Sequence, residues 1–171
     1  MFQFKNHFTM RIITALTMGY WFVFWALNGL DKFLCRENLG LIKWYGNDRV
    51  DKFGMYMDRL GIGSDGVTGT LWFAGIWELG VAGLCFYGLM LAFKTHDMRH
   101  RLHVFALALG GSVLTFIGFC IFDVVVGDRA ELLEHSTYIG VVIISYMAVV
   151  LEPVFVELVA NYNQRTVRRA V

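Results

Sequence analysis

Long apolar segments dominate the pattern of hydrophobic and polar positions along this chain. A helix needs about 20 residues to cross the roughly 30 Å hydrocarbon layer of a membrane, where lipid offers the backbone no hydrogen-bond partner. Four segments meet this length, over residues 11–34, 69–93, 102–126 and 133–162. The pattern predicts an all-α integral membrane protein: a bundle of four transmembrane helices that forms a single membrane domain over residues 1–171.

The segment between the first two spans, residues 35–68, has a pattern of its own. Within DRVDKFGMYMDRLGIGSDG, apolar residues recur at spacings of three and four, and charged residues occupy the other positions. The apolar positions are Val50, Phe53, Met57 and Leu60. This period predicts an amphipathic helix that lies along the membrane surface or on a neighbouring helix.

The composition agrees with a membrane protein and excludes other classes. Hydrophobic residues make up 57% of the 171 residues and charged residues 17%, whereas soluble domains carry about 25% charged residues. The formal net charge is +1 and the basic residues are not clustered, so we expect no nucleic-acid partner. The three cysteines form no CxxC pair, and neither a disulfide framework nor a zinc site is expected.

The basic residues indicate the orientation of the chain. An even number of spans places both termini on one side, together with the connection between the second and third spans. This side has eight basic residues in short segments: Lys5, Arg11, Lys94, Arg99, Arg101, Arg165, Arg168 and Arg169. The other side has seven: Lys32, Arg36, Lys43, Arg49, Lys52, Arg59 and Arg129. Because basic loops stay in the cytoplasm, we expect cytoplasmic termini in a bacterial-type inner or intracytoplasmic membrane.

Polar and ionisable residues interrupt the apolar spans at a common depth. An ionisable residue in a membrane helix costs at least ~2.5 kcal/mol on insertion scales, so it normally faces protein or water. Because successive helices run in opposite directions, the interruptions in all four spans fall in the half of the bilayer near the long loop. We expect one polar layer formed by Asn28, Asp31, Lys32, Glu78, Asp123 and His135.

Spacing indicates how these groups pair. Asn28 and Lys32 are four residues apart and share one flank of the first helix. In a bundle, Glu78 is expected to meet Asn28 or Lys32, whereas Asp123 and His135 flank the turn that joins their helices. An interfacial position is the alternative for the groups nearest the span ends, with a snorkelling lysine; these are Asp31, Lys32, Asp123, Glu134 and His135.

Glu152 lies apart from this layer. It is in the other half of the fourth span, beside the only proline, Pro153, and no polar residue at a matching position suggests a partner within the chain. We therefore expect Glu152 to face a partner subunit.

Histidine positions constrain the cofactors. A transmembrane haem usually needs two histidines at matching depth on facing helices, and only His135 lies on the long-loop side. His96, His100 and His103 follow at spacings of four and three, which suits a metal such as Zn or Cu, or simply a basic cytoplasmic turn near lipid headgroups. We expect no cofactor held by the chain's own ligands, and a quinone or lipid at a subunit interface.

Three segments, LNGLDKFL, LGIGSDG and FAGIWELGVAGLCFYGLMLAF, resemble the DoxX-like family of small four-helix membrane proteins, over about residues 21–93. The resemblance rests on a glycine and a lysine near the end of the first helix and on a glutamate followed by glycines in the second. These are Gly29, Lys32, Glu78, Gly80, Gly83 and Gly88. The resemblance implies a four-helix bundle and, for some members, association with membrane oxidoreductases that exchange electrons with quinone. Other members look like chaperones or transport helpers.

Three functions are consistent with these features. The favoured one is a non-catalytic accessory or structural subunit of a larger membrane complex in energy metabolism, an oxidoreductase or photosynthetic assembly. It would dock through its helices and long loop onto other membrane subunits and lipids. The second is a stand-alone quinone-reactive oxidoreductase in which Glu78 or Asp123 accepts a proton and Trp77 forms a wall for the ring. The third is a small transporter or membrane chaperone with a polar path along Glu78 and Asn28.

Overall fold

The computed structural model describes residues 11–63, 65–94 and 97–170, and helices make up most of these ranges. In chain order they are α2 (Ile12–Leu34), α3 (Val50–Arg59), α4 (Asp65–Lys94), α5 (Met98–Val126) and α6 (Arg129–Ala170). All except α3 are long and apolar enough to cross a membrane. The predicted all-α bundle of four transmembrane helices is therefore confirmed.

The last three helices begin before the apolar segments that predicted them. Helix α4 begins at residue 65 instead of 69, α5 at 98 instead of 102, and α6 at 129 instead of 133. Asp97 and Asp128 cap α5 and α6, each accepting two backbone N–H groups at 3.0 to 3.2 Å. Hydropathy detects the part of a helix that can lie in lipid, whereas these caps start the helix in the polar region.

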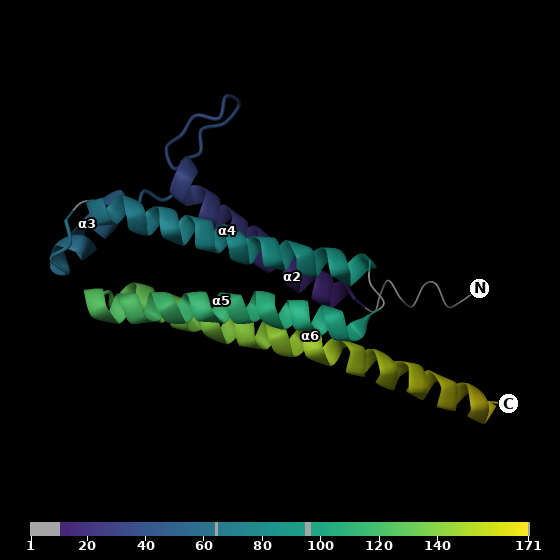
Figure 1. Ribbon diagram of the computed structural model, residues 1–171. Helices are drawn as coiled ribbons and strands as arrows, with labels where there is room; N and C mark the ends of the chain where they lie inside the picture. The colour runs from purple at the N-terminus through teal and green to yellow at the C-terminus, as the bar shows by residue number, and fades with distance from the viewer. Residues whose placement is uncertain (1–10, 64, 95–96, 171) are drawn as a thin grey trace.

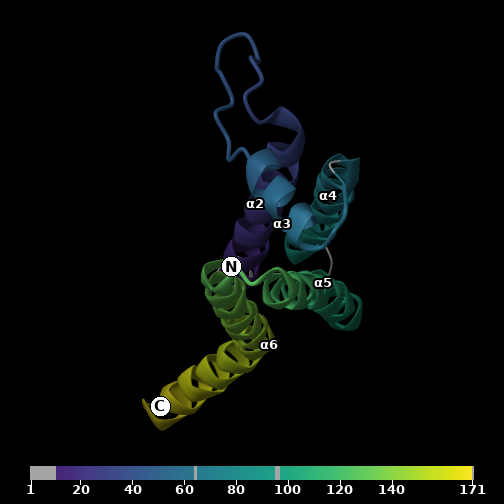
Figure 2. The same cartoon turned by 90° about the vertical axis from the view of Figure 1, so that its left-hand side faces the viewer.

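The membrane helices form two pairs. Helix α2 packs against α4, and α5 packs against α6 (Figure 1). In the end-on view, α4 and α5 lie on one side of the bundle and α2 and α6 on the other (Figure 2). The first pair packs closely where Gly29 of α2 meets Gly75 of α4. A Cβ at Gly29 would lie only 3.1 Å from the carbonyl oxygen of Gly75, so the missing side chain lets the two backbones approach. Large side chains fill the core between the pairs, among them Trp21, Trp25, Phe116 and Leu109.

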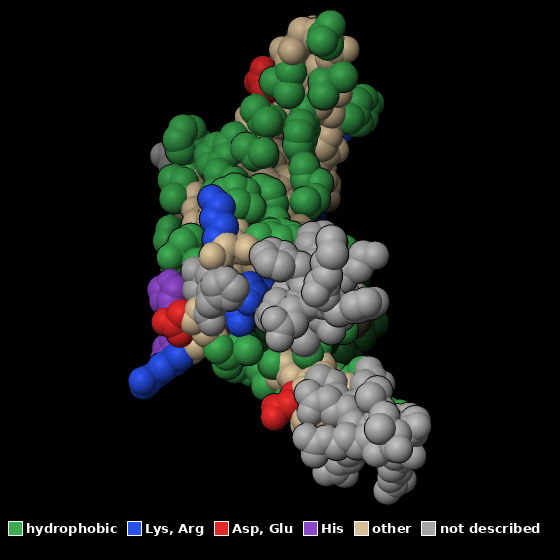
Figure 3. Space-filling view, turned by 90° about the vertical axis from the view of Figure 1, so that its right-hand side faces the viewer, with side chains coloured by type: hydrophobic (Ala, Val, Ile, Leu, Met, Phe, Trp, Pro, Cys, Tyr) green, Lys and Arg blue, Asp and Glu red, His purple; other side chains and the backbone are tan. Residues whose placement is uncertain are grey.

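The two ends of the bundle differ. Helix α3 and residues 35–49 lie at one end, and the start of α2 and the end of α6 lie at the other (Figure 1). We call the half with α3 and Glu78 the loop-side half, and the half with Ile12 and Glu152 the terminal half. Figure 3 looks onto the terminal end, where basic, acidic and histidine side chains gather, while hydrophobic side chains cover the flanks.

The predicted amphipathic helix is present as α3, and it packs on neighbouring helices. Phe53 stacks on Phe122 of α5, with ring centroids 5.8 Å apart and an interplanar angle of 16°. Met57 is buried in a small apolar cluster with Val67 and Leu71 of α4. Helix α3 therefore covers the loop-side end of the bundle.

The expectation that Glu152 faces a partner subunit is wrong, because its hydrogen-bond partners lie within the chain. Its carboxylate accepts the backbone N–H groups of Ile13 at 2.9 Å and Thr14 at 3.0 Å, and the Thr14 hydroxyl at 2.5 Å. The first N–H groups of a helix have no partner inside the helix, and a negative charge suits the positive end of the helix dipole. Glu152 therefore caps α2, and its carboxylate is bonded within the chain instead of to a partner subunit. An unpaired helix start has no hydropathy signal, which is why the sequence pattern missed this contact.

Candidate functional site

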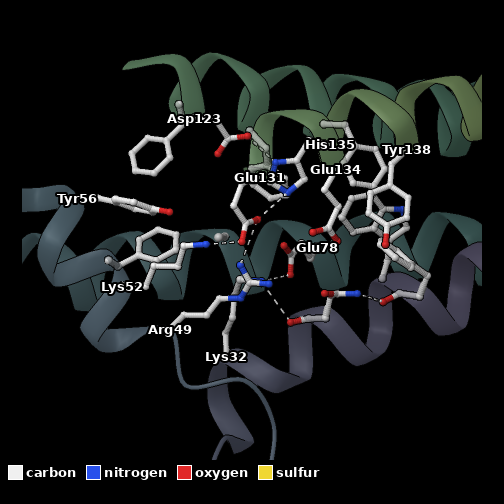
Figure 4. A pocket seen from close by; sticks show the side chains of 18 residues that line it. Lys32, Arg49, Lys52, Tyr56, Glu78, Asp123, Glu131, Glu134, His135 and Tyr138 are labelled. Atoms are coloured by element: carbon white, nitrogen blue, oxygen red, sulfur yellow. Dashed lines mark hydrogen bonds and ion pairs between the residues drawn. The ribbon is translucent and has the colours of Figure 1, made fainter. Parts of the chain in front are cut away.

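A cavity of about 180 Å³ lies in the loop-side half, between the four membrane helices and α3. Every helix contributes to its lining (Figure 4). We call it the polar cavity because charged side chains form much of its wall: Lys32, Arg49, Lys52, Glu78, Asp123, Glu131 and Glu134, together with His135.

The most buried ion pair in the cavity joins α2 to α4. Lys32 Nζ lies 2.5 Å from Oε2 of Glu78 and also donates to the backbone carbonyl of Asn28 at 3.3 Å. The two charged side chains are 9% and 3% exposed. Because an isolated charge at this depth is costly, each group stabilises the charged form of the other. The expected contact between Glu78 and Lys32 is present.

A second pair joins α5 to α6. Gly127 ends α5 in the left-handed conformation, with φ of 80°, and the chain turns back so that the last turn of α5 faces the first turns of α6. His135 Nδ1 lies 2.7 Å from Oδ2 of Asp123, and His135 Nε2 lies 3.6 Å from Oε2 of Glu131. The imidazole ring therefore lies between two carboxylates, one on each helix.

Two cations close the cavity from the side of α3. Lys52 Nζ lies 2.5 Å from Oε1 of Glu131 and 3.2 Å from Oδ2 of Asp128. Arg49 Nη1 lies 4.0 Å from the other carboxylate oxygen of Glu131. The Tyr56 hydroxyl donates to Asp128. Helix α3 is thus tied to the start of α6 by charge as well as by aromatic packing.

These contacts shift the pKa values of the groups that lie outside the spans. The hydrogen bond from Tyr56 and the backbone N–H of Glu131 hold the pKa of Asp128 well below its ordinary value. Burial acts to lower the pKa of Lys52, but its hydrogen bonds to Glu131, Tyr56 and Asp128 outweigh burial, and the pKa lies above its ordinary value. Asp128 and Lys52 are therefore both charged at neutral pH.

Aromatic rings form the inner wall of the cavity. Phe116 is 1% exposed, and its ring centroid lies 4.8 Å from that of Trp25 and 5.1 Å from that of Tyr138, on which it stacks. Trp25 Nε1 donates to the Ser112 hydroxyl at 2.8 Å, so its polar edge is satisfied away from the charged wall. A cavity with a charged wall and an aromatic wall suits a flat ring with polar substituents.

The structure divides the predicted polar layer. Five of its six members line the cavity: Asn28, Lys32, Glu78, Asp123 and His135. Asp31 does not, because its Oδ1 accepts the indole N–H of Trp44 at 2.6 Å and its Oδ2 accepts the backbone N–H of Asn47 at 2.9 Å. Asp31 therefore anchors the loop after α2. Trp77, expected as a ring wall, points elsewhere and donates to the Thr115 hydroxyl at 2.8 Å.

Several cavity residues were not among the predicted site residues, chiefly Arg49, Lys52 and Glu131. One local signal was available for Glu131, because Asp128 and Glu131 have the spacing of a capping box, which places Glu131 in the first turn of α6. Lys52 and Glu131 are 79 residues apart in the sequence, and no local pattern predicts a contact between them.

The histidines that suit a metal by their spacing contact other groups. His100 Nε2 lies 3.2 Å from the Tyr87 hydroxyl, and His103 Nδ1 lies 2.9 Å from the backbone carbonyl of Arg99. His96 lies outside the described residues. Over residues 11–63, 65–94 and 97–170, no three His, Cys, Asp or Glu side chains gather as a metal site.

Comparisons of the chain with protein-family models, with curated proteins and with solved structures find no match. The resemblance to the DoxX-like family therefore stays an expectation.

Proposed function

We propose that this protein binds a ring of the quinone type in the polar cavity and moves protons to and from it, as an accessory subunit of a membrane oxidoreductase. The observation that carries the proposal is the pairing of two walls at one depth. The Lys32–Glu78 ion pair and the Asp123–His135 hydrogen bond face a cavity that Trp25, Phe116 and Tyr138 also line.

The space between the walls favours a ligand over a purely structural role. Protein interiors are close-packed, and a buried ion pair that only joins helices needs no room beside it. Here about 180 Å³ remains next to the Lys32–Glu78 ion pair and the Asp123–His135 hydrogen bond. A polar cavity of this size holds water when it is empty, and a ring with two carbonyl oxygens would replace that water and keep its hydrogen bonds.

The chemistry assigns roles to the chain's own groups. Quinone carbonyls accept hydrogen bonds, and Lys32 and His135 line the cavity together with the aromatic residues as possible donors. Reduction of a quinone to the quinol takes two electrons and two protons. In this proposal Glu78 and Asp123, each hydrogen-bonded to one of these two groups, exchange the protons, and a partner subunit supplies the electrons.

A titration with a tail-free probe tests the proposal. Dimethoxy-methyl-benzoquinone is added to the purified protein in lipid nanodiscs, and tryptophan fluorescence is recorded. We expect saturable quenching that is largely lost in Trp25→Phe, because Trp25 forms the ring wall. The double variant Lys32→Met, Glu78→Met removes both charges without leaving one unpaired and should abolish saturation. Equal saturation in the double variant would falsify the proposal.

A specific observation also supports the docking role expected of an accessory subunit. Residues 35–49 project from the bundle as a narrow loop (Figure 1, Figure 2). An isolated β-bridge joins Asn38 and Lys43, and the tip between them is apolar and exposed, with Leu41 at 101% and Ile42 at 62%. An exposed apolar tip beyond the end of a span fits a surface that another membrane subunit covers.

The docking role has its own test. A tagged protein is extracted gently from its own membrane and analysed by native mass spectrometry. We expect Leu41→Asp, Ile42→Asp to remove a co-migrating subunit that wild type retains. Glu37→Gln, on the same loop, is the matched control and should retain it. Identical complexes in all three samples would remove the docking role from the loop.

The geometry favours a transporter or chaperone less. A polar path through the bundle would have to pass the terminal half, where the buried core below Trp25 contains Trp21, Met18 and Leu109, each at most 1% exposed. For the surroundings of the protein we propose a bacterial-type inner or intracytoplasmic membrane with both termini in the cytoplasm. The slight excess of Lys and Arg on the terminal side supports this orientation.

A further inference from the structure

A second hollow adjoins the polar cavity on the outer side of the bundle, between α4 and α5. These two helices lie side by side in both views of the fold (Figure 1, Figure 2). The hollow measures about 420 Å³ and is open. We call it the apolar groove, and its lining residues are Phe53, Thr70, Phe73, Ala74, Trp77, Leu114, Thr115, Gly118, Phe119 and Phe122.

The groove suits hydrocarbon and not a polar molecule. The indole N–H of Trp77 donates to the Thr115 hydroxyl at 2.8 Å, and that hydroxyl donates to the backbone carbonyl of Gly111 at 2.8 Å. These polar groups therefore satisfy one another. Apart from Thr70, the rest of the lining is apolar or aromatic. Apart from Phe53 of α3, the lining residues belong to α4 and α5, within the segments that are long and apolar enough to cross a membrane.

The groove and the polar cavity share a wall. Phe53, Ala74, Phe119 and Phe122 line both hollows. Ala74 has the smallest side chain of the four. Because the two hollows are adjacent, one molecule that reaches past this wall would place a polar ring among the charged side chains and a tail along the outside of α4 and α5.

We propose that the apolar groove holds the hydrocarbon tail of the ligand whose ring occupies the polar cavity, so that the ligand is a tailed quinone drawn from the lipid. This inference rests on the proposed function and names its substrate class. A free quinone that enters from water would leave the groove without a role.

The tail contributes position more than hydrophobic free energy. Lipid tails are as apolar as the groove, and a tail that moves from lipid into protein leaves no water behind. A tail held beside Ala74 instead keeps its ring close to the cavity, which raises the effective concentration of the ring there. We expect a tail held in the groove to lower the Kd of the tailed ligand about tenfold compared with the same ligand when the groove is blocked.

Gly118→Leu is designed to fill the groove without disturbing the fold. A Cβ at Gly118 would meet no atom within 4 Å, although the residue lines the groove, so the new side chain enters open space. Leucine also favours a helix more than glycine does. Gly110→Leu is the matched control, because Gly110 lies on the same helix with nothing within 4 Å and is not part of the groove lining.

The experiment titrates both variants and wild type in nanodiscs of one lipid composition. The probes are decylubiquinone and the same dimethoxy-methyl-benzoquinone ring without a tail. We expect Gly118→Leu to raise the Kd of decylubiquinone about tenfold and to leave the Kd of the tail-free ring within twofold. Gly110→Leu should change neither, which controls for partition of the tailed probe into lipid.

The outcomes separate this inference from the proposed function. If wild type binds the tail-free ring and Gly118→Leu leaves decylubiquinone binding unchanged, the groove does not hold the tail and the proposed function stands. A groove occupied by a phospholipid acyl chain gives this same result. An equal loss of both probes in Gly118→Leu also overturns the inference. If neither probe binds wild type, the proposed function fails.

Discussion

Two buried carboxylates, Glu78 and Glu152, show how differently the two halves of the bundle are built. Both lie in membrane helices, and they are 2% and 5% exposed. Glu78 pairs with the side chain of Lys32 beside a cavity, whereas Glu152 is bonded to two backbone N–H groups and a hydroxyl at the start of α2. Burial is similar, but the kinds of partner differ.

The kind of partner distinguishes a structural carboxylate from a candidate functional one. Backbone donors are fixed by the helix, so the partners of Glu152 cannot turn toward a ligand without unwinding α2. The Lys32 side chain has rotatable bonds and can share its hydrogen bonds with a ligand in the cavity.

The largest effect is expected from Glu152→Ala, which leaves two backbone N–H groups and the Thr14 hydroxyl without their acceptor. Unsatisfied buried groups cost about 1–3 kcal/mol each, and we expect the free energy of unfolding in detergent to fall by about 4 kcal/mol. Circular dichroism during thermal or denaturant unfolding measures this change.

The matched control is Glu157→Ala, because Glu157 is exposed on the same helix. Its expected effect is within about 0.5 kcal/mol. The folded fraction of Glu152→Ala should bind the quinone ring normally. Equal losses of stability in the two variants would contradict the capping role of Glu152.

The next effect concerns the ion pair in the cavity. Lys32→Met leaves Glu78 buried without its partner, and we expect a loss of about 3 kcal/mol in the free energy of unfolding. Lys32→Met, Glu78→Met removes both charges and should return stability to within about 1 kcal/mol of wild type, while ring binding stays lost. A double variant as unstable as the single one would show that the pair is needed for folding, like Glu152.

The smallest effect is expected at the edge of the cavity, where α3 meets α6. Lys52→Met removes the contacts to Glu131 and Asp128, but the Lys52 side chain is 35% exposed, so solvent screens the pair. We expect a loss of about 1 kcal/mol. Hydrogen exchange of the α3 amides measures it, and the amides of α4 and α5 should keep their protection.

Acid should weaken the attachment of α3 to the start of α6, as Lys52→Met is expected to do. The pKa of Asp128 is lowered in the folded state, so its contribution to stability is present above its ordinary pKa and is lost as the pH falls below about 4. The pKa of Lys52 is raised, so its contribution is full below its ordinary pKa and is lost only as the pH rises through the raised value. The protection factors of the α3 amides, which correct for the intrinsic pH dependence of exchange, should therefore decrease below about pH 4.

Asp128→Asn tests the source of this acid sensitivity. Asparagine caps a helix about as well as aspartate, so α6 keeps its start while the titrating charge disappears. The α3 amides of this variant should exchange slightly faster than those of wild type at neutral pH. The variant should also lack most of the decrease in α3 protection that wild type shows below pH 4. An unchanged acid response would assign the sensitivity to another group.

Much of the fold could be predicted because it depends on local spacing. The four spans follow from segment length, and α3 follows from the recurrence of Val50, Phe53, Met57 and Leu60. The common depth of Lys32, Glu78 and His135 follows from counting residues along antiparallel helices.

The partners of the polar groups could not be predicted in the same way. Thr14 meets Glu152 across 138 residues, and Lys52 meets Glu131 across 79. Neither contact has a signal in the neighbouring residues, because each depends on how two separate helices are rotated and shifted against one another.

Apolar length and residue count were enough to predict four membrane-spanning helices and the relative depth of their charged residues, because both are counted along one chain. The packing of the helices was needed to show that adjacent residues take different roles, with Lys32 at the cavity and Asp31 at the projecting loop. Successive side chains of a helix point about 100° apart, and the packing of the other helices selects which direction meets a cavity.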